Sequence, residues 1–177
     1  MSTLTTERLD LTPVSLPLLE AVIRGDRLEA EALSGARFPD AWPGRALVER
    51  AFSSPLDRLR DDPEAFLWGT RLMVTRGQEE RVVVGSVVLN GRPDATGTVE
   101  IGYGVEGRSQ GQGYATEGSR AVLHWTLQQA NVRRVIATTP AWHRASLRVI
   151  EKLGMRPAGT LDHALLGELL VFERSRE

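Results

Sequence analysis

One stretch, from Thr98 to Gln129, constrains the fold of this chain more than any other. It begins with a run in which four apolar residues alternate with small or charged ones: Val99, Ile101, Tyr103 and Val105. Such alternation predicts a strand with one buried face. The opposite face carries one carboxylate, Glu100, and then two positions without a side chain, Gly102 and Gly104. This strand therefore offers an acidic group with open space beside it.

A glycine-rich turn and a long helix follow the strand. Gly107, Gly111 and Gly113 allow backbone angles that are closed to other residues, so the turn can expose its amides. The helix opens at Tyr114 and carries Glu117 in its first turn, where the helix dipole favours an acid. Backbone N–H groups that point outward from a helix start form an anion site, and phosphate is its most natural ligand.

Three phosphate-binding patterns compete for this stretch. The letters GYGVEG match the dinucleotide fingerprint GxGxxG, but its first glycines fall inside the expected strand, and the place of the ribose-binding acid is taken by Leu127. A P-loop is excluded because no Gly-Lys-Ser/Thr sequence is present. The third pattern, (Gln/Arg)-x-x-Gly-x-(Gly/Ala), fits from Arg108 or from Gln110. We prefer the register from Gln110, because it runs directly into the helix.

The stretch resembles the acetyl-CoA-binding motif of the GNAT N-acetyltransferases, in particular the branch named for ribosomal-protein N-terminal (alanine and serine) acetyltransferases. Four segments carry the resemblance in the order and spacing of that branch: TTERLDLTP, GTVEIGYGV, GQGYATE and ASLRVIEKLGM. The resemblance covers nearly the whole chain, from about Thr5 to about Arg174. It implies a GNAT fold, acetyl-CoA as the acyl donor and an amine as the acceptor.

The remaining periodicities predict an α/β (α+β) chain with the element order β-α-α-β-β-β-α-β-α-β-β. Helices are expected over about 15–33 and 46–59, the second interrupted near Pro55, with a loop over 34–44 between them. Further strands are expected over 7–12, 66–75, 82–89 and 134–139, around Leu161 and over 165–172, and a helix over 144–153 ends at Gly154. We expect a single domain over residues 1–177, with a mixed, mostly antiparallel sheet and helices on both faces, as the GNAT resemblance implies.

Composition excludes several classes of function. A net charge of −1 argues against a nucleic-acid-binding surface, and the absence of cysteine rules out disulfides, a cysteine nucleophile and a thiolate metal site. Histidines and carboxylates do not cluster at ligand spacing, so no metal site is expected. No signal peptide and no apolar run of ~18 residues is present, so we expect a cytoplasmic protein without a membrane partner. A homodimer is compatible with the family, although no residue here decides it.

By the resemblance, acetyl-CoA is held mainly by the turn and the helix start. In the motif that begins at Gln110, five amides would bind the diphosphate: those of Gly111, Gln112, Gly113, Tyr114 and Ala115. The backbone of Val105 would pair with the pantetheine arm, and Arg108 is a candidate charge partner for phosphate. His143 stands where the family usually has an asparagine that bonds the pantetheine, and we expect it to keep that contact. Ser146, three residues later, is a further candidate contact to the cofactor.

Two side chains are candidates for the chemistry, since acetyl transfer to an amine needs little more than a base for the amine and an acid for the leaving thiolate. Glu100 is the candidate base, with Glu168 and Asp162 as alternatives. Ser146 is the candidate acid, because Ile150 occupies the place of the tyrosine that is common in the wider family. Each residue also has a structural interpretation without a part in catalysis. Glu100 would be a solvent-facing glutamate on a strand, and Ser146 would be a serine that bonds the backbone of its own helix.

The acceptor is not defined by any pattern in the sequence. Phe38 and Trp42 in the 34–44 loop are predicted to close over the core, to line the acceptor pocket, or both. A protein N-terminus, an amino acid, a polyamine and an aminoglycoside all stay open. We favour direct acetyl transfer from acetyl-CoA to a primary amine in a ternary complex, since neither a cysteine nor a GxSxG elbow offers a covalent route. The alternative is a non-catalytic acyl-CoA-binding or regulatory module, suggested by His143 and by the missing tyrosine.

Overall fold

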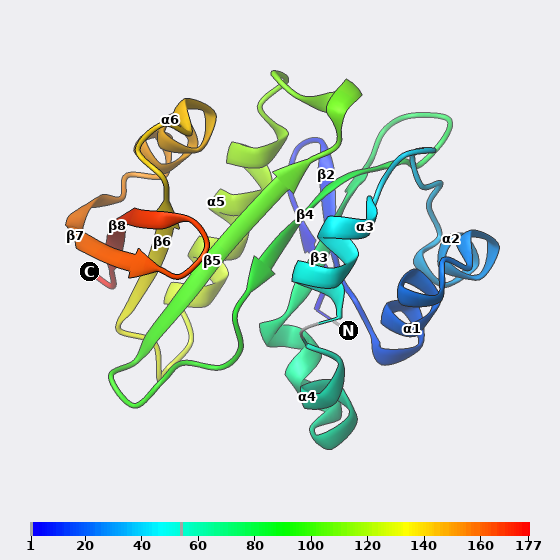
Figure 1. Ribbon diagram of the computed structural model, residues 1–177. Helices are drawn as coiled ribbons and strands as arrows, with labels where there is room; N and C mark the ends of the chain where they lie inside the picture. The colour runs from blue at the N-terminus through cyan, green and yellow to red at the C-terminus, as the bar shows by residue number, and fades with distance from the viewer. Residues whose placement is uncertain (1, 54) are drawn as a thin grey trace.

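The computed structural model describes residues 2–53 and 55–177, and Figure 1 shows the strands side by side between two groups of helices. Eight strands form one sheet in the order β1-β2-β3-β4-β5-β6-β8-β7. Their bounds are Leu4–Thr5 (β1), Leu9–Pro13 (β2), Thr70–Thr75 (β3), Val83–Leu89 (β4), Thr98–Val105 (β5), Arg134–Thr139 (β6), Arg156–His163 (β7) and Gly167–Ser175 (β8). Only β5 and β6 are parallel, and the other neighbouring pairs are antiparallel. The predicted mixed, mostly antiparallel sheet is confirmed.

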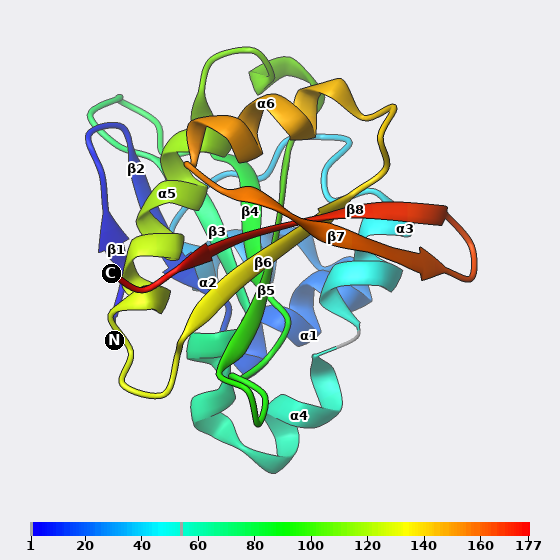
Figure 2. The same ribbon diagram turned by 90° about the vertical axis from the view of Figure 1, so that its left-hand side faces the viewer.

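The helices cover both faces of this sheet, as predicted. They are α1 (Leu16–Arg24), α2 (Arg27–Ser34), α3 (Arg45–Leu47), α4 (Leu56–Asp61), α5 (Tyr114–Leu127) and α6 (Arg144–Lys152). A π-helical turn, η1 (Val48–Phe52), and two 3₁₀ turns, η2 (Pro63–Trp68) and η3 (Gly107–Ser109), complete the described elements. In Figure 2 α5 lies to the left of the central strands β4, β5 and β6, while α3 lies to their right.

Strand β3 shows how the sequence supplies a core on each side of the sheet, since all six of its residues are buried. Met73 belongs to the core under α5, and its neighbours Leu72 and Val74 belong to the core under α1. Arg71 is also fully buried, and its guanidinium lies 4.7 Å from the ring centroid of Trp125 on α5. Loss of water lowers the pKa of Arg71 to about 10, so the side chain keeps its charge at neutral pH.

Some predicted boundaries are wrong, and each error has a local cause. The helix expected over 15–33 is two helices, because Gly25 adopts a left-handed conformation (φ +72°) that ends α1. The strand expected from residue 66 starts at Thr70, because residues 63–68 form the η2 turn. The helix expected over 46–59 is divided into α3, η1 and α4, and α4 begins directly after Pro55, where an interruption was expected.

Strands β5 and β6 separate along their length, and this separation positions the candidate site. Their pairing covers only the first three residues of β5 and ends at Glu100, opposite Ile136. Beyond this point β5 stays paired with β4 and β6 with β8. Glu106 donates its N–H to Val84, and Glu100 accepts from the N–H of Asn90, so the even-numbered residues of β5 direct their backbone groups toward β4. The odd-numbered residues beyond the separation direct theirs toward the space between the strands: Ile101, Tyr103 and Val105.

Candidate functional site

Glu100 lies where β5 and β6 begin to separate, and two neighbours fix its carboxylate. Asn90 donates from Nδ2 to Oε2 at 3.0 Å, and Thr138 donates from Oγ1 to Oε1 at 2.8 Å. Asn90 follows β4 and Thr138 lies on β6, so the carboxylate is oriented from both sides. An ionised carboxylate has about four acceptor sites, so two hydrogen bonds leave room for an amine. No sequence pattern pointed to Asn90 or Thr138, although each is a polar residue at the end of an apolar run.

Glu100 also lines a cavity of about 350 Å³ between β5 and the α3–α4 segment. Gly102 and Gly104 line the same cavity, and a Cβ on either residue would meet no atom within 4 Å. The open space predicted beside Glu100 is therefore present. Arg58 on α4 lines this cavity too and donates from Nη1 to the backbone oxygen of Asn90 at 3.3 Å. With one acid and one base among the described lining residues, the cavity is not an acidic groove of the kind that would favour polyamines or aminoglycosides.

The glycine turn follows η3 and leads directly into α5 at Tyr114. Gly111 and Gly113 have φ angles of +74° and +85°, which favour glycine strongly. Gly113 is the N-cap of α5, and no described side chain caps this helix start. The first amides of α5 are therefore available to an anion, as a diphosphate site requires. Gln110 donates from Nε2 to the backbone oxygen of Val105 at 3.1 Å and joins the turn to the end of β5.

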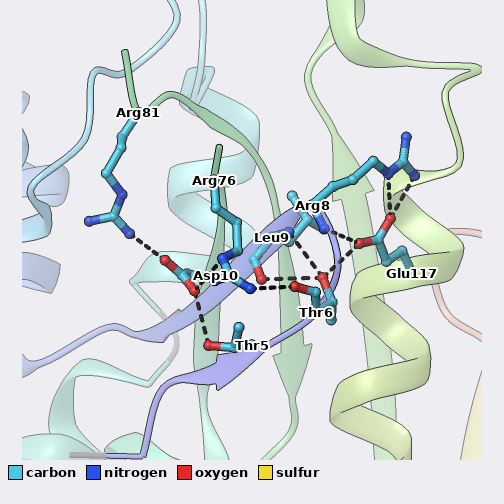
Figure 3. Close-up of polar contacts among 8 residues, drawn as sticks. All are labelled: Thr5, Thr6, Arg8, Leu9, Asp10, Arg76, Arg81 and Glu117. Carbon is cyan, nitrogen blue, oxygen red and sulfur yellow. Dashed lines mark hydrogen bonds and ion pairs between the residues drawn. The ribbon is translucent and has the colours of Figure 1, made fainter. Parts of the chain in front are cut away.

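Arg8, a residue far away in sequence, contacts this turn through a hydrogen bond to its backbone. It lies between β1 and β2 and donates from Nη1 to the backbone oxygen of Gln112 at 2.9 Å. Its Nε donates to Oε2 of Glu117 at 2.7 Å, and its guanidinium lies 4.6 Å from the ring centroid of Tyr114. Figure 3 shows Arg8 directed toward Glu117, with Thr6 beside them. The sequence of the TTERLDLTP segment predicts a strand over 7–12, but no local pattern predicts that Arg8 reaches residue 117.

Ser146 occupies the first turn of α6, as predicted, and a tyrosine reaches it from another element. The hydroxyl of Tyr103 on β5 lies 3.0 Å from Oγ of Ser146 and donates to its backbone oxygen at 3.2 Å. Ser146 is buried and Tyr103 is partly buried. Burial raises the pKa of Tyr103, and the hydrogen bond with Ser146 offsets part of that rise. The alternation of apolar residues predicted Tyr103 on the buried face of the strand, and no pattern gave it a part in the site.

Four other candidates are exposed or would act through their backbone. His143 is the N-cap of α6 and exposed, and its ring lies 5.7 Å from that of Trp142 without capping the helix. Arg108 lies in η3 with its side chain exposed, so it could turn toward a phosphate. Val105 ends β5, and Ala115 is the second residue of α5. All of them border the turn or the separated ends of β5 and β6.

Four residues considered in the sequence analysis do not line the Glu100 cavity in the part of the chain that the structure describes. Phe38 and Trp42 are buried, with ring centroids 5.9 Å apart, and they line a different cavity beside α1 and α2. They close over the core under α1, and we do not propose them as acceptor contacts. Glu168 and Asp162 face each other across the β7–β8 hairpin and are exposed. Neither is positioned like Glu100.

Within residues 2–53 and 55–177, no group of three or more His, Asp or Glu residues is arranged to hold a metal ion. In the same residues, no helix has the length and apolar character needed to cross a membrane.

Comparison with known proteins agrees with this geometry. Residues 10–156 match the family of the Acetyltransferase (GNAT) domain. The chain is 28% identical over 156 residues to the Bacillus subtilis protein called uncharacterized N-acetyltransferase YjdG, covering 87% of this chain and 89% of that one.

Two solved structures share the fold over almost the whole chain. One is the ribosomal-protein-S5-alanine acetyltransferase from Vibrio fischeri, with a TM-score of 0.69, 13% identity and coverage of 100% and 98% of the two chains. The other is RimL, described as a ribosomal L7/L12 alpha-N-protein acetyltransferase in complex with coenzyme A, with a TM-score of 0.66, 16% identity and 98% of each chain covered. The protein belongs to the GNAT acetyltransferase family and is an acetyl-CoA-dependent acyltransferase.

Proposed function

We propose that this protein transfers the acetyl group of acetyl-CoA directly to the nitrogen of a primary amine in a ternary complex. The observation that carries the proposal is the Glu100 carboxylate, held by Asn90 and Thr138 in a cavity that adjoins the separation of β5 and β6. A base in this position can take the amine proton, while the space between the strands is suited to an extended ligand that pairs with a free strand edge.

The turn and the strand edge support acetyl-CoA as the donor. The uncapped start of α5 offers amides to a diphosphate, and the odd-numbered residues of β5 offer backbone groups to the amides of a pantetheine arm. RimL, a structural neighbour of this chain, is described in complex with coenzyme A. Acetyl-CoA supplies an activated thioester. The residues of this chain orient the thioester, accept the proton of the amine and donate a proton to the thiolate.

The proposed sequence of events places the base and the acid on different elements. Glu100 accepts a proton from the amine as the nitrogen bonds to the acetyl carbon. The carbon–sulfur bond breaks, and the thiolate leaves toward the start of α6, where Ser146 and Tyr103 provide hydroxyl groups and the helix dipole favours negative charge. Ser146 gives its hydroxyl proton to the thiolate and regains one from water, while Glu100 gives the amine proton to water, so the products are an N-acetylated amine and a thiol.

A protein N-terminus and a small-molecule amine are both acceptors within this proposal. An α-amine, with a pKa of about 8, needs less help from Glu100 than a lysine side chain near 10.4 does. In the alternative, a non-catalytic module, Glu100 is expected to be held in a structural bond or to face bulk water. Glu100 accepts two hydrogen bonds but still lines a cavity, which supports the catalytic function.

Two measurements test the proposal in sequence. Calorimetric titration with acetyl-CoA, with NADH as control, should give binding to acetyl-CoA only. A screen of primary amines with thiol release as readout should then give turnover that depends on Glu100, with E168Q as a matched control for E100Q. Binding without turnover on any amine would favour the non-catalytic module, and no binding at all would overturn the proposal.

A further inference from the structure

The start of α5 carries a feature that opposes phosphate binding unless something compensates it. Glu117 lies in the first turn of the helix whose free amides would hold the diphosphate, and its side chain is only 19% exposed. A carboxylate there competes with a phosphate for the positive end of the helix dipole. The carboxylate also repels the phosphate, and because Glu117 is partly buried, water screens this repulsion only in part.

Glu117 is ionised at neutral pH. Partial burial raises the pKa of its carboxyl, but the hydrogen bonds from Thr6 and from the backbone and side chain of Arg8, together with the charge of Arg8, lower it below the usual value. Oε1 accepts from Thr6 Oγ1 at 2.6 Å and from the N–H of Arg8 at 2.9 Å. The negative charge is therefore present whenever acetyl-CoA would bind.

Arg8 lies where it can cancel this charge. Its Nη2 is 2.6 Å from Oε2 of Glu117, in addition to the hydrogen bond from Nε to the same oxygen. The same guanidinium bonds the backbone oxygen of Gln112 and lies over the Tyr114 ring. One side chain thus contacts the turn before Gly113, the residue after it and the acid one turn further on.

Arg8 also fits closely against the glycine itself. A Cβ on Gly113 would lie 3.3 Å from Nη2 of Arg8, so the guanidinium packs directly over the N-cap of α5. Its position depends on the β1–β2 hairpin, which is fixed by a separate set of contacts in Figure 3. There, Asp10 accepts from Nη2 of Arg81 at 2.8 Å and from Thr5 Oγ1 at 3.0 Å.

We propose that Arg8 is a positioning residue for acetyl-CoA, because it neutralises Glu117 and holds the turn so that the amides at the start of α5 face the diphosphate. This inference rests on the proposed function and adds to it a residue from the opposite end of the chain. It differs from a purely structural ion pair in one respect: the charge of Glu117 harms binding once Arg8 is removed.

A charge-rescue experiment tests this difference. Dissociation constants for CoA and for dephospho-CoA, which keeps the diphosphate, are measured by calorimetry for the wild type, R8Q, E117Q and R8Q/E117Q. R8Q should weaken both ligands about fivefold or more, as expected for one uncompensated charge near a phosphate site, and the penalty should shrink at high salt. R8Q/E117Q should recover most of the lost affinity, because the repelling carboxylate is gone.

The matched control is R81Q, which removes an ion pair from the same hairpin without a contact to the turn, and it should bind CoA like the wild type. Thermal unfolding of each variant shows whether it folds, and R8K supplies a second variant that keeps the charge if R8Q does not fold. Equal weakening in R8Q and R8Q/E117Q would overturn the proposal, and so would wild-type affinity in R8Q. Failure of the wild type to bind CoA would instead overturn the proposed function.

Discussion

The hydroxyl of Tyr103 on β5 lies 3.0 Å from Oγ of Ser146 on α6, so two hydroxyl groups from different elements meet at the start of one helix. Because Tyr103 also donates to the backbone oxygen of Ser146, the serine Oγ is the natural donor toward the tyrosine or toward a ligand. Both hydroxyls lie on the side of β5 that faces α6, while Glu100 faces the cavity under α3 and α4. An acyl group between β5 and β6 would have the base on one side and these hydroxyls on the other.

The pair predicts a kinetic effect on the chemical step. S146A and Y103F should each lower kcat by about tenfold to a hundredfold. Y103F should leave the Kd for CoA within about twofold, since Tyr103 does not belong to the turn, whereas S146A should also raise this Kd, since Ser146 is a candidate contact to the cofactor. The double variant should lose little more than the worse single variant, because the two hydroxyls act as one unit. Steady-state kinetics with calorimetry checks this. Full multiplicative losses would show that the hydroxyls act independently.

Glu100 is expected to control the pH dependence of turnover. E100Q keeps the hydrogen-bonding shape but cannot accept a proton, so kcat should fall by about a hundredfold below the pKa of the acceptor amine. The deficit should narrow as the pH rises through that pKa, because the amine then loses its proton to solvent. The pH–rate profiles of wild type and E100Q check this, with E168Q on the exposed β7–β8 hairpin as control. Parallel profiles would remove Glu100 as the base.

Much of this site was predictable because its signals are local. The alternation around Glu100 defined β5 and its open face, and the glycines before Tyr114 defined the start of α5. The contacts that orient these groups were not predictable, since Asn90, Thr138 and Arg8 reach them only through tertiary packing. The separation of β5 and β6 is likewise a property of the sheet and of no single segment.

The aromatic loop over residues 34–44 shows what composition alone does not resolve. Phe38 and Trp42 were candidates for the acceptor pocket because a loop rich in turn residues normally lies at the surface. Both are buried, and Trp42 packs edge-on against Phe52 with ring centroids 6.0 Å apart. Composition identified them as large apolar groups but did not show which of two cavities they border. Their lid-like position over the core was the other prediction made for them, and it fits the structure.

Gly113 is expected to be essential for both geometry and binding. Its φ of +85° disfavours any side chain, and a Cβ would crowd Nη2 of Arg8 at 3.3 Å. G113V should therefore lose CoA binding while the protein stays folded, and the milder G113A should cost about 1 kcal/mol of stability from the left-handed conformation. Calorimetry and chemical denaturation check the two effects. G107A is the control, since Gly107 has no positive φ and a Cβ there meets nothing within 4 Å.

Glu117 should make stability depend on acid pH. Its pKa is lowered in the folded protein relative to the unfolded chain, where a glutamate titrates near about 4.3. The carboxylate therefore contributes stability that is fully present above that value and is lost as the pH falls through the folded pKa. E117Q should flatten the acid limb of the unfolding free energy below about pH 5. Denaturation at a series of pH values checks this, and an unchanged acid limb would show that Glu117 is not coupled to folding.

Arg58 is expected to select acceptors that carry an anionic group near the amine. It lines the Glu100 cavity and, among the described residues, makes no ion pair within 4.0 Å, so its charge is free for a ligand. Asn90 contacts both charged groups: its backbone oxygen accepts from Arg58, and its side chain donates to Glu100. The guanidinium of Arg58 and the carboxylate of Glu100 are therefore separated by a single residue, Asn90. In the amine screen, an α-amino acid should then be a better acceptor than its carboxamide, and polyamines should be poor. Each α-amino acid and its carboxamide form a matched pair of acceptors. R58E should make the carboxamide the better acceptor of the pair, by raising the KM of the acid and lowering the KM of the amide. If R58E weakens both members of a pair equally, Arg58 supports the cavity wall and does not read the acceptor.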